Sequence, residues 1–210
     1  MIRNIIIKAA LDCNISCKYC YVKHNRQYDT TNHVMKVDTL QVIMEKIGEY
    51  LKQSPKVDRL TLYWHGGEPL LCGKEFFQQS YLFQKKYFPS GVSVANTIQT
   101  NGTLLDLDWL NLIKKINYDI CLSLDGPAEI NDMWRQTRDG KGTYGQVVRA
   151  IELLKSQGFP VSLLSVVTPE ALPHGRMIYR HLRELGATWI DFMYPFYSKI
   201  DNTIAQTVEP

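Results

Sequence analysis

Three cysteines in one short segment are the residues of this sequence best suited to chemistry. Cys13, Cys17 and Cys20 lie within "LDCNISCKYCY" (11–21), with the spacing Cys-x3-Cys-x2-Cys. Sites rich in thiolates select zinc or iron–sulfur clusters. Three ligands from so short a segment converge on one centre and leave its fourth position to another group.

Zinc is one candidate for this centre, because His24 follows Cys20 after three residues and would complete a Cys3His set. Structural zinc usually staples small domains that lack a core, whereas a chain of 210 residues can bury a sizeable one. The cysteines also follow an expected buried strand, where α/β proteins place their active sites. Both features favour a four-iron cluster with one open iron, and a zinc-stabilised binding protein is the alternative of another class.

Composition narrows the kinds of partner that we expect. The formal net charge is +3, and the lysines and arginines are scattered rather than gathered into a basic stripe, so we expect no nucleic-acid partner. No apolar run approaches the length of a membrane span, so we expect no membrane insertion. An odd number of cysteines without a secretion signal indicates a reducing compartment, the cytoplasm.

Short apolar, β-rich runs alternate with amphipathic stretches along the chain. The expected strands cover 4–10, 59–66, 93–100, 119–126, 161–168 and 188–195. This alternation predicts βαβ units with parallel strands and right-handed crossovers, arranged as an open doubly wound sheet or as a partial barrel. In either architecture the chemistry is expected where the carboxyl ends of strands meet the following loops.

Helical patterns with recognisable ends separate these strands. The expected helices cover 39–53, 107–116, 144–157 and 175–185. Asp38 and Asp106 are expected to cap the first two of them. Gly158 and Gly186 are well placed to end the last two, because a left-handed residue at that point is usually glycine.

Two further segments follow expected strands and carry turn signals. In "WHGGEPLL" (64–71), the paired glycines permit a close approach of the backbone, and Pro69 fixes the turn after Glu68. In "IQTNGTLL" (98–105), Asn101 and the following glycine form a turn signal.

A fourth segment, "LSLDGPAEINDMWRQTRDGKGTY" (122–144), begins with alternating polar and apolar residues. Ser123 and Asp125 share one face of a strand, opposite Leu122 and Leu124. If the leucines pack outward against helices, the polar pair points inward, towards a ligand.

The segment "CNISCKYC" resembles the Cys-x3-Cys-x-aromatic-Cys signature of radical S-adenosylmethionine (SAM) enzymes, with Tyr19 at the aromatic position. The other three segments resemble landmarks of that family and occur in its order. From Cys13 to about Pro195 the chain is most similar to the branch that modifies peptides and proteins, which includes anaerobic sulfatase-maturating enzymes and ribosomal-peptide maturases. The resemblance implies an α/β partial (β/α)6 TIM-like barrel over 1–195 and an irregular tail over 196–210.

The resemblance also implies the chemistry. Cys13, Cys17 and Cys20 would hold a [4Fe–4S] cluster whose open iron binds SAM. An electron from an external donor of the flavodoxin or ferredoxin type would cleave SAM to methionine and a 5′-deoxyadenosyl radical. That radical would abstract a hydrogen atom from a peptide or protein substrate, or in the alternative from a small molecule.

Individual residues receive roles from the same resemblance or, for His65, Val166 and Met193, from their positions beside its landmarks or late in the expected strands. The segment containing Gly66, Gly67, Glu68 and Pro69 would hold the amino group of SAM, and His65 is the catalytic candidate. The remaining candidates for SAM binding are Asn101, Ser123 and Asp125, either Arg135 or Arg149 for the carboxylate, Tyr19 for the adenine face, and Val166 and Met193 at the edge of the adenine pocket.

One part of the family pattern is missing from the printed sequence. Members usually carry a C-terminal extension, often called SPASM, whose added cysteines bind auxiliary clusters. Outside the motif only Cys72 and Cys121 remain, too few for another cluster, and we expect both to be structural. Substrate recruitment is therefore expected to use the barrel mouth, a further C-terminal part or a separate recognition partner.

Overall fold

The computed structural model describes residues 1–24 and 34–195, except for the side chains of 23 and 24. Its elements in chain order are β1 (Asn4–Ala10), α1 (Tyr21–His24), α2 (Val37–Gln53), β2 (Arg59–Gly66), η1 (Pro69–Cys72), α3 (Gly73–Tyr87), β3 (Ser93–Thr100), α4 (Leu107–Ile116), β4 (Asp119–Ser123), α5 (Ala128–Trp134), α6 (Tyr144–Ser156), β5 (Val161–Val166), η2 (Leu172–His174), α7 (Gly175–Glu184) and β6 (Ala187–Met193). The expected tail over 196–210 lies outside the described residues, and so does the side chain of the proposed zinc ligand His24.

The six strands form one sheet in the order β1-β2-β3-β4-β5-β6. This result confirms the α/β class with parallel strands, and it is consistent with a partial TIM-like barrel. The first three strands have the bounds that the sequence predicts. The last three differ, because β4 and β5 end at Ser123 and Val166 and β6 begins one residue earlier than expected, at Ala187.

The chain divides into two compact units. The first unit comprises Met1–Cys13, the described part of Thr30–Thr100, and Leu104–Ile120. The second unit comprises the described parts of Asn14–Asp29 and Cys121–Pro210, together with Asn101–Thr103.

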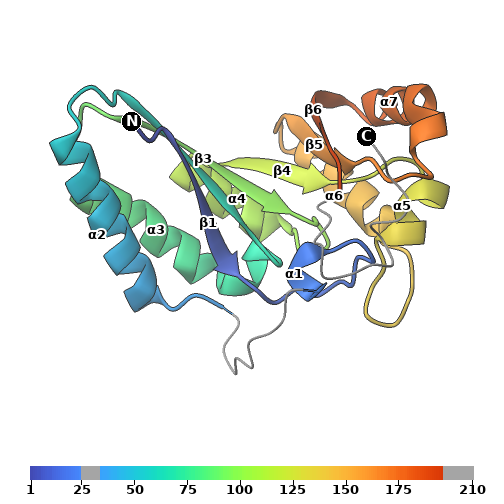
Figure 1. Cartoon of the computed structure of the whole chain (residues 1–210), viewed down its shortest axis with the longest axis horizontal. Coiled ribbons are helices and arrows are strands. Elements are labelled where there is room, and N and C mark those ends of the chain that lie inside the picture. Colours follow the sequence, from blue (N-terminus) through green and yellow to red (C-terminus); the bar gives the residue numbers. More distant parts are fainter. Residues whose placement is uncertain (25–33, 196–210) are drawn as a thin grey trace. The chain divides into compact units, whose positions relative to one another are not determined.

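In the first unit, α2 and α3 lie next to each other (Figure 1). The helix α2 buries a stripe at helical spacing, which includes Leu40, Met44 and Leu51. A side chain at Gly48 of α2 would lie 2.6 Å from the carbonyl oxygen of Tyr87, so glycine permits the close contact with α3. An aromatic cluster completes this core and consists of Trp64, Phe76, Phe77, Trp109 and Tyr118.

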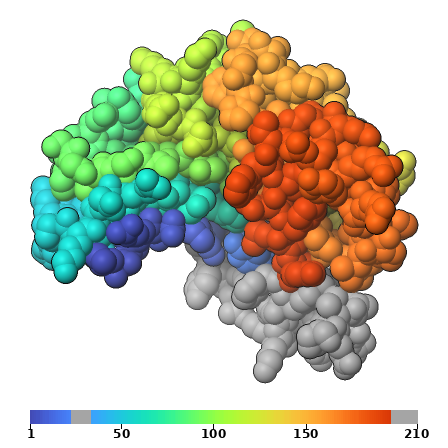
Figure 2. All heavy atoms as spheres, turned by 90° about the horizontal axis from the view of Figure 1, so that it is seen from above, coloured from blue at the N-terminus to red at the C-terminus, as the bar shows by residue number. Residues whose placement is uncertain are grey.

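In the second unit, α6 and α7 bury short apolar stripes, which include Val147 and Leu154 of α6 and Leu182 of α7. The strand β6 is different, because most of its side chains are exposed, among them Trp189 and Met193. The residues of α7 and β6 form the orange-red part of the surface in Figure 2.

The structure corrects the predicted helix starts in one case. The helix α2 begins at Val37 and has Lys36 as its N-cap, so the prediction that Asp38 caps this helix is wrong. Asp106 does cap α4, where its side chain accepts from the backbone N–H of Trp109 at 2.7 Å. The helices α1, α3 and α5 were not predicted from the sequence.

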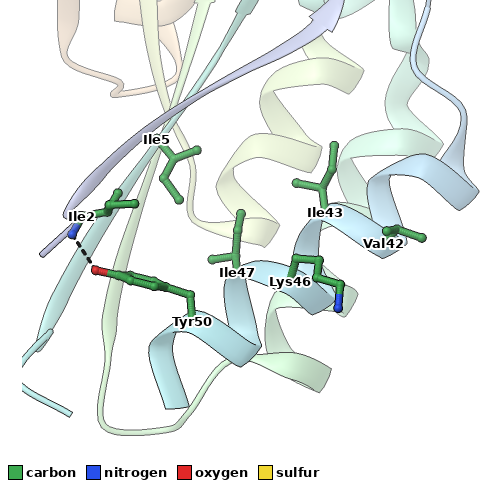
Figure 3. Close-up of a pocket in the computed structure, with 7 residues that line it drawn as sticks. All are labelled: Ile2, Ile5, Val42, Ile43, Lys46, Ile47 and Tyr50. Carbon is green, nitrogen blue, oxygen red and sulfur yellow. Dashed lines mark hydrogen bonds between the residues drawn. The ribbon is translucent and has the colours of Figure 1, made fainter. Parts of the chain in front are cut away.

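An apolar pocket on the first unit lies between β1 and α2 (Figure 3). It is lined by Ile2, Ile5, Val42, Ile43, Lys46, Ile47 and Tyr50. Of these residues, Ile5 lies in the amino-terminal half of β1 and Ile2 precedes that strand, whereas the predicted site residues follow the carboxyl ends of strands. Among the helices that the structure describes, none is both long and apolar enough to cross a membrane.

Candidate functional site

The turn after β2 packs directly onto the chain that leads to Cys13 in the first unit. The backbone N–H of Gly67 donates to the carbonyl of Ala10 at 2.6 Å, and that of Glu68 donates to the carbonyl of Asp12 at 2.7 Å. A side chain at Gly67 would lie 2.1 Å from the carbonyl oxygen of Asp12. Gly66 has a φ of +130°, which other residues rarely adopt. Both glycines are therefore required for the backbone approach that the sequence predicts.

Glu68 is fully buried in the first unit, where its carboxylate links the ends of two strands. Its Oε1 accepts from the hydroxyl of Thr100 at 2.6 Å and from the backbone N–H of Leu70 at 3.0 Å. The second of these bonds caps η1, with Pro69 in its first turn. Glu68 thus anchors its own turn, and its predicted contact with the amino group of SAM stays a prediction.

His65 lies on the opposite face of β2 from the buried Trp64. Its Nδ1 accepts from the backbone N–H of Gly66 at 2.6 Å, so the neutral ring carries its proton on Nε2. Burial lowers the pKa of His65, and the cation of Lys8, which pairs with it in the sheet register, lowers it further. The side chain is therefore a neutral donor, and its predicted catalytic role stays a prediction.

The two cysteines outside the motif are held as thiols. Burial raises the pKa of Cys72 to about 12, and its Sγ donates to the carbonyl of Ala9 at 3.3 Å. Burial also raises the pKa of Cys121 to about 12. Metal ligation requires the thiolate, so both residues suit a structural role.

In the second unit, the backbone after the first cysteine runs beside the chain that follows α5. The N–H of Ser16 donates to the carbonyl of Gln136 at 2.6 Å, and the N–H of Lys18 donates to the carbonyl of Trp134 at 2.9 Å. A turn then closes between Cys17 and Cys20, with a backbone hydrogen bond of 3.2 Å. We call residues 14–20 the cysteine loop.

Asn101 is hydrogen-bonded to the beginning of the cysteine loop. Its Nδ2 donates to Oδ1 of Asn14 at 2.9 Å, and Nδ2 of Asn14 donates to the hydroxyl of Thr103 at 2.7 Å. The Oδ1 of Asn101 accepts from the backbone N–H of Thr103 at 2.9 Å, which closes the turn. These contacts give Asn101 a positioning role that the sequence did not predict, and its predicted contact with SAM stays a prediction.

Asp125 is the centre of a buried polar group just beyond β4. Its Oδ2 accepts from the hydroxyl of Tyr19 at 2.5 Å and lies 3.0 Å from Nε of Arg135. Its Oδ1 accepts from the backbone N–H of Val166 at 2.9 Å. The carboxylate is fully buried, and three donors from separate parts of the second unit meet it. Asp125 therefore joins β5 and α5 to the cysteine loop.

Arg135 is a buried cation in this group. Burial would lower its pKa, but the adjacent Asp125 carboxylate outweighs that effect and raises the pKa above its ordinary value. The guanidinium lies 5.5 Å from the centroid of the Tyr19 ring, and its Nη1 donates to Sγ of Cys17 across 4.0 Å. The backbone of Arg135 is held by Thr143, whose hydroxyl donates to its carbonyl at 3.0 Å.

The other predicted SAM contacts lie on the strand ends or on a helix of the second unit. Ser123 is buried at the end of β4, and Val166 and Met193 are paired neighbours at the ends of β5 and β6. Arg149 is exposed on α6 and is not part of the Asp125 group. Tyr19, predicted to face adenine, has Arg135 over its ring and Trp134 at 5.8 Å.

The donor set fits a [4Fe–4S] cluster. None of the five cysteines, all of which the structure describes, forms a disulfide, and a buried cation lies beside Cys17, which suits an anionic, thiolate-bound group. Within the described ranges, no three His, Cys, Asp or Glu side chains gather closely enough to hold one metal ion. A cluster does not need such a gathering, because its thiolates bind different irons.

Sequence reasoning missed the residues that hold the site residues in place. Asn14, Thr100 and Thr143 are short polar side chains whose partners lie 87, 32 and 8 residues away in sequence. Their types carry no signal that distinguishes them from ordinary loop residues, so only the fold could identify them.

The sequence matches the Radical SAM superfamily over residues 8–188, and the chain belongs to that family. Members of this family use a [4Fe–4S] cluster and S-adenosylmethionine.

Curated relatives include a serine-type anaerobic sulfatase-maturating enzyme of Klebsiella aerogenes, 34% identical over 86% of this chain and 43% of its own length. A cysteine-type anaerobic sulfatase-maturating enzyme of Clostridium perfringens is 30% identical over 90% of this chain and 51% of its own length. The chain thus spans about half the length of the curated relatives that it matches.

A solved structure of native anSMEcpe with bound AdoMet and the Kp18Cys peptide has a TM-score of 0.83 and 26% identity. The superposition covers 97% of this chain and 55% of that chain. Streptococcus suis SuiB bound to S-adenosylmethionine has a TM-score of 0.69 at 12% identity, which supports the shared fold alone.

Proposed function

We propose that this chain is the core of a radical SAM enzyme that acts on a peptide or protein. In this proposal it generates a 5′-deoxyadenosyl radical from SAM and uses it to abstract a hydrogen atom from the substrate. The observation that carries the proposal is the similarity to a maturase structure in which AdoMet and a peptide are both bound. When bound, the cluster would supply the electron that cleaves SAM.

The proposal gives each group of residues a task. Cys13, Cys17 and Cys20 hold the cluster, and the turn over 66–69 together with Ser123 binds the methionine part and the ribose of SAM. Val166 and Met193 edge the adenine pocket, in keeping with their paired positions at two strand ends. Of the two arginines, Arg149 suits the SAM carboxylate better, because it is exposed whereas Arg135 is already paired with Asp125.

The proposal extends to partners and place. Reduction of the cluster requires an external donor of the flavodoxin or ferredoxin type, and substrate recruitment uses the barrel mouth, a further C-terminal part or a separate recognition partner. A cytoplasmic location is in keeping with five cysteines that form no disulfide in the described residues. The core over 1–195 is proposed to act as one functional domain.

Anaerobic reconstitution tests the proposal. We expect about four irons per chain and a broad visible absorbance, followed on reduction by release of methionine and 5′-deoxyadenosine from SAM. Cys17→Ala should abolish this cleavage, and Arg180→Gln on the exposed side of α7 is the matched control. Colourless protein with one zinc, or unchanged cleavage by the Cys17 variant, would refute the assignment.

Sulfatase-derived peptides test the substrate class. Relatives named as serine-type and cysteine-type maturases match this chain with similar identity, 34% and 30%, so the identity does not separate the two types. A matched pair of peptides that differ only by serine or cysteine at the target position distinguishes them. We expect one member of the pair to accelerate formation of 5′-deoxyadenosine and to lose hydrogen, as measured by mass spectrometry.

A further inference from the structure

The buried ion pair of the second unit, formed by Asp125 and Arg135, is oriented with its cation towards Cys17. Arg135 lies between two groups, with Nε 3.0 Å from Oδ2 of Asp125 and Nη1 4.0 Å from Sγ of Cys17. Both side chains of the ion pair are almost completely buried, with 7% of Arg135 and none of Asp125 exposed. The cationic end of the pair therefore adjoins the cysteine, in a setting where water screens charge weakly.

The surroundings hold the pair in this direction. The carboxylate of Asp125 is held by the hydroxyl of Tyr19 and by the backbone N–H of Val166. The guanidinium lies over the ring of Tyr19, and its own backbone is bonded to Thr143. Rotation of the pair would break several of these contacts at once.

We propose that Arg135 is a positioning residue that raises the reduction potential of the cluster held by Cys17. Asp125 partly neutralises the charge of Arg135 and so sets the size of this effect. This inference rests on the proposed function, in which Cys17 is a ligand of the cluster. The potential of an iron–sulfur cluster depends on net charge and on hydrogen bonds to its sulfurs. A fixed cation beside one ligand favours the form with more negative charge, which is the reduced form.

The step concerned is a one-electron reduction. A low-potential reductant such as dithionite gives one electron to the cluster, no bond in the protein forms or breaks, and no proton is needed. The cluster with its thiolates gains one negative charge. Arg135 stabilises that charge by its position, because a guanidinium stays protonated in proteins with or without a carboxylate partner.

Opposite substitutions test the inference through the midpoint potential of the reconstituted protein, measured by redox titration with electron paramagnetic resonance. Arg135→Gln removes the cation and should shift the midpoint to a more negative value. Asp125→Asn leaves the cation uncompensated and should shift it to a more positive value. The double variant removes both charges and should lie between the two, and Arg135→Lys should stay nearest to the unsubstituted protein.

If Arg135 and Asp125 had only a structural role, the iron contents and midpoint potentials of the variants would follow another pattern. Local disorder would lower the iron content in both single variants and would not move their midpoints in opposite directions. Arg180→Gln, an exposed arginine of the same unit, serves as the matched control. Midpoints that move in the same direction, or that equal the control, overturn the inference.

A failure of the proposed function can be distinguished from a failure of the inference about Arg135. If the unsubstituted protein takes up no iron–sulfur cluster, the function is wrong before any variant is measured. If Arg135→Gln does not fold, Asp125→Asn and the double variant still give the sign of the shift, because the double variant leaves no unpaired buried charge.

Discussion

The five cysteines fall into two classes at the scale of single residues. Three belong to the motif, whereas Cys72 and Cys121 are held as thiols by burial that raises the pKa of each to about 12. Cys72 also donates its S–H to a backbone carbonyl. A ligand must be a thiolate, so these two positions are not expected to bind iron.

Substitution of these residues gives a simple prediction. Cys72→Ala and Cys121→Ala should retain the full iron content after reconstitution, whereas Cys17→Ala should lose most of it, because only the motif cysteines are expected to ligate. Iron and sulfide assays measure the difference. Loss of iron in either of the first two variants, with the protein still folded, would contradict the two classes.

The lowered pKa of His65 predicts how the stability of the protein changes with pH. Burial and Lys8 lower its folded-state pKa below the ordinary 6.5, so the unfolded chain binds the proton more readily. The free energy of unfolding should therefore be unaffected by His65 above about pH 6.5 and should fall as the pH drops from there through the folded pKa. Protonation of Nδ1 would also remove the acceptor of the Gly66 N–H bond.

Urea unfolding at about pH 7.5 and about pH 5.5 measures this effect. The loss of stability on acidification should be smaller in His65→Gln, which has no titrating ring. The ring resonances of His65 in a nuclear magnetic resonance titration should give a midpoint below 6.5. A midpoint above 6.5 would show that the sign is wrong.

At the scale of elements, the turn between β2 and η1 depends on one backbone contact. In Gly67→Ala, the added methyl group would lie 2.1 Å from the carbonyl oxygen of Asp12, so one of the two segments must move. We expect a loss of about 2 kcal/mol in the free energy of unfolding, as for other overpacked sites. The iron content should fall as well, because Asp12 precedes Cys13.

A second glycine supplies the control for this change. In Gly145→Ala the new methyl group meets no atom within 4 Å, and the residue lies within α6. This variant should be neutral or more stable by up to about 1 kcal/mol, because alanine favours a helix more than glycine does. Equal destabilisation of both variants in urea unfolding would contradict the argument from close contact.

The elements also show what a sequence permits one to predict. The strands over 4–10, 59–66 and 93–100 were predicted with their observed bounds, because buried alternation and turn residues mark both ends. The strand β4 is shorter than predicted, since Asp125 takes its place beside β5 through its carboxylate, which accepts from Val166. The capping role expected of Asp38 was wrong because the helix begins two residues earlier than predicted, at Val37, so that Asp38 lies within its first turn.

Site residues divide in the same way. The close backbone approach at Gly66 and Gly67 was predicted from the paired glycines, whereas iron ligation by Cys13, Cys17 and Cys20 stays a prediction. The partners of Asp125 were not predicted, because Tyr19 and Arg135 lie 106 and 10 residues away and only the folded chain selects them. Long-range pairs of ordinary polar residues leave no periodic pattern in a sequence.

At the scale of the whole molecule, the aromatic core of the first unit contains none of the three motif cysteines. The aromatic side chains around Trp64 pack among themselves, and Gln84 and Asn96 satisfy each other beneath them. The cysteine loop of the second unit has mainly polar contacts instead. Removal of the cluster should therefore affect the two regions differently.

Hydrogen exchange measures this difference. After chelation of the cluster, amides of residues 14–20 should exchange faster, while those of β1, β2 and β3 should keep their protection, because local opening follows local contacts. Circular dichroism should change little. Global loss of protection on chelation would show that the cluster is needed for the fold of the entire chain.

The tight turn at Gly66 and Gly67 also has a consequence for protein engineering. Two backbone segments touch there without any side chain between them, so this position offers no room for variation. A library designed to change the substrate would gain nothing from diversity at the turn. The exposed side chains of β6 that have no proposed role in the site, Trp189, Asp191 and Phe192, can vary without disturbing a packed core. If these positions are randomised while the turn is kept fixed, a change in substrate specificity can be distinguished from a loss of folded protein.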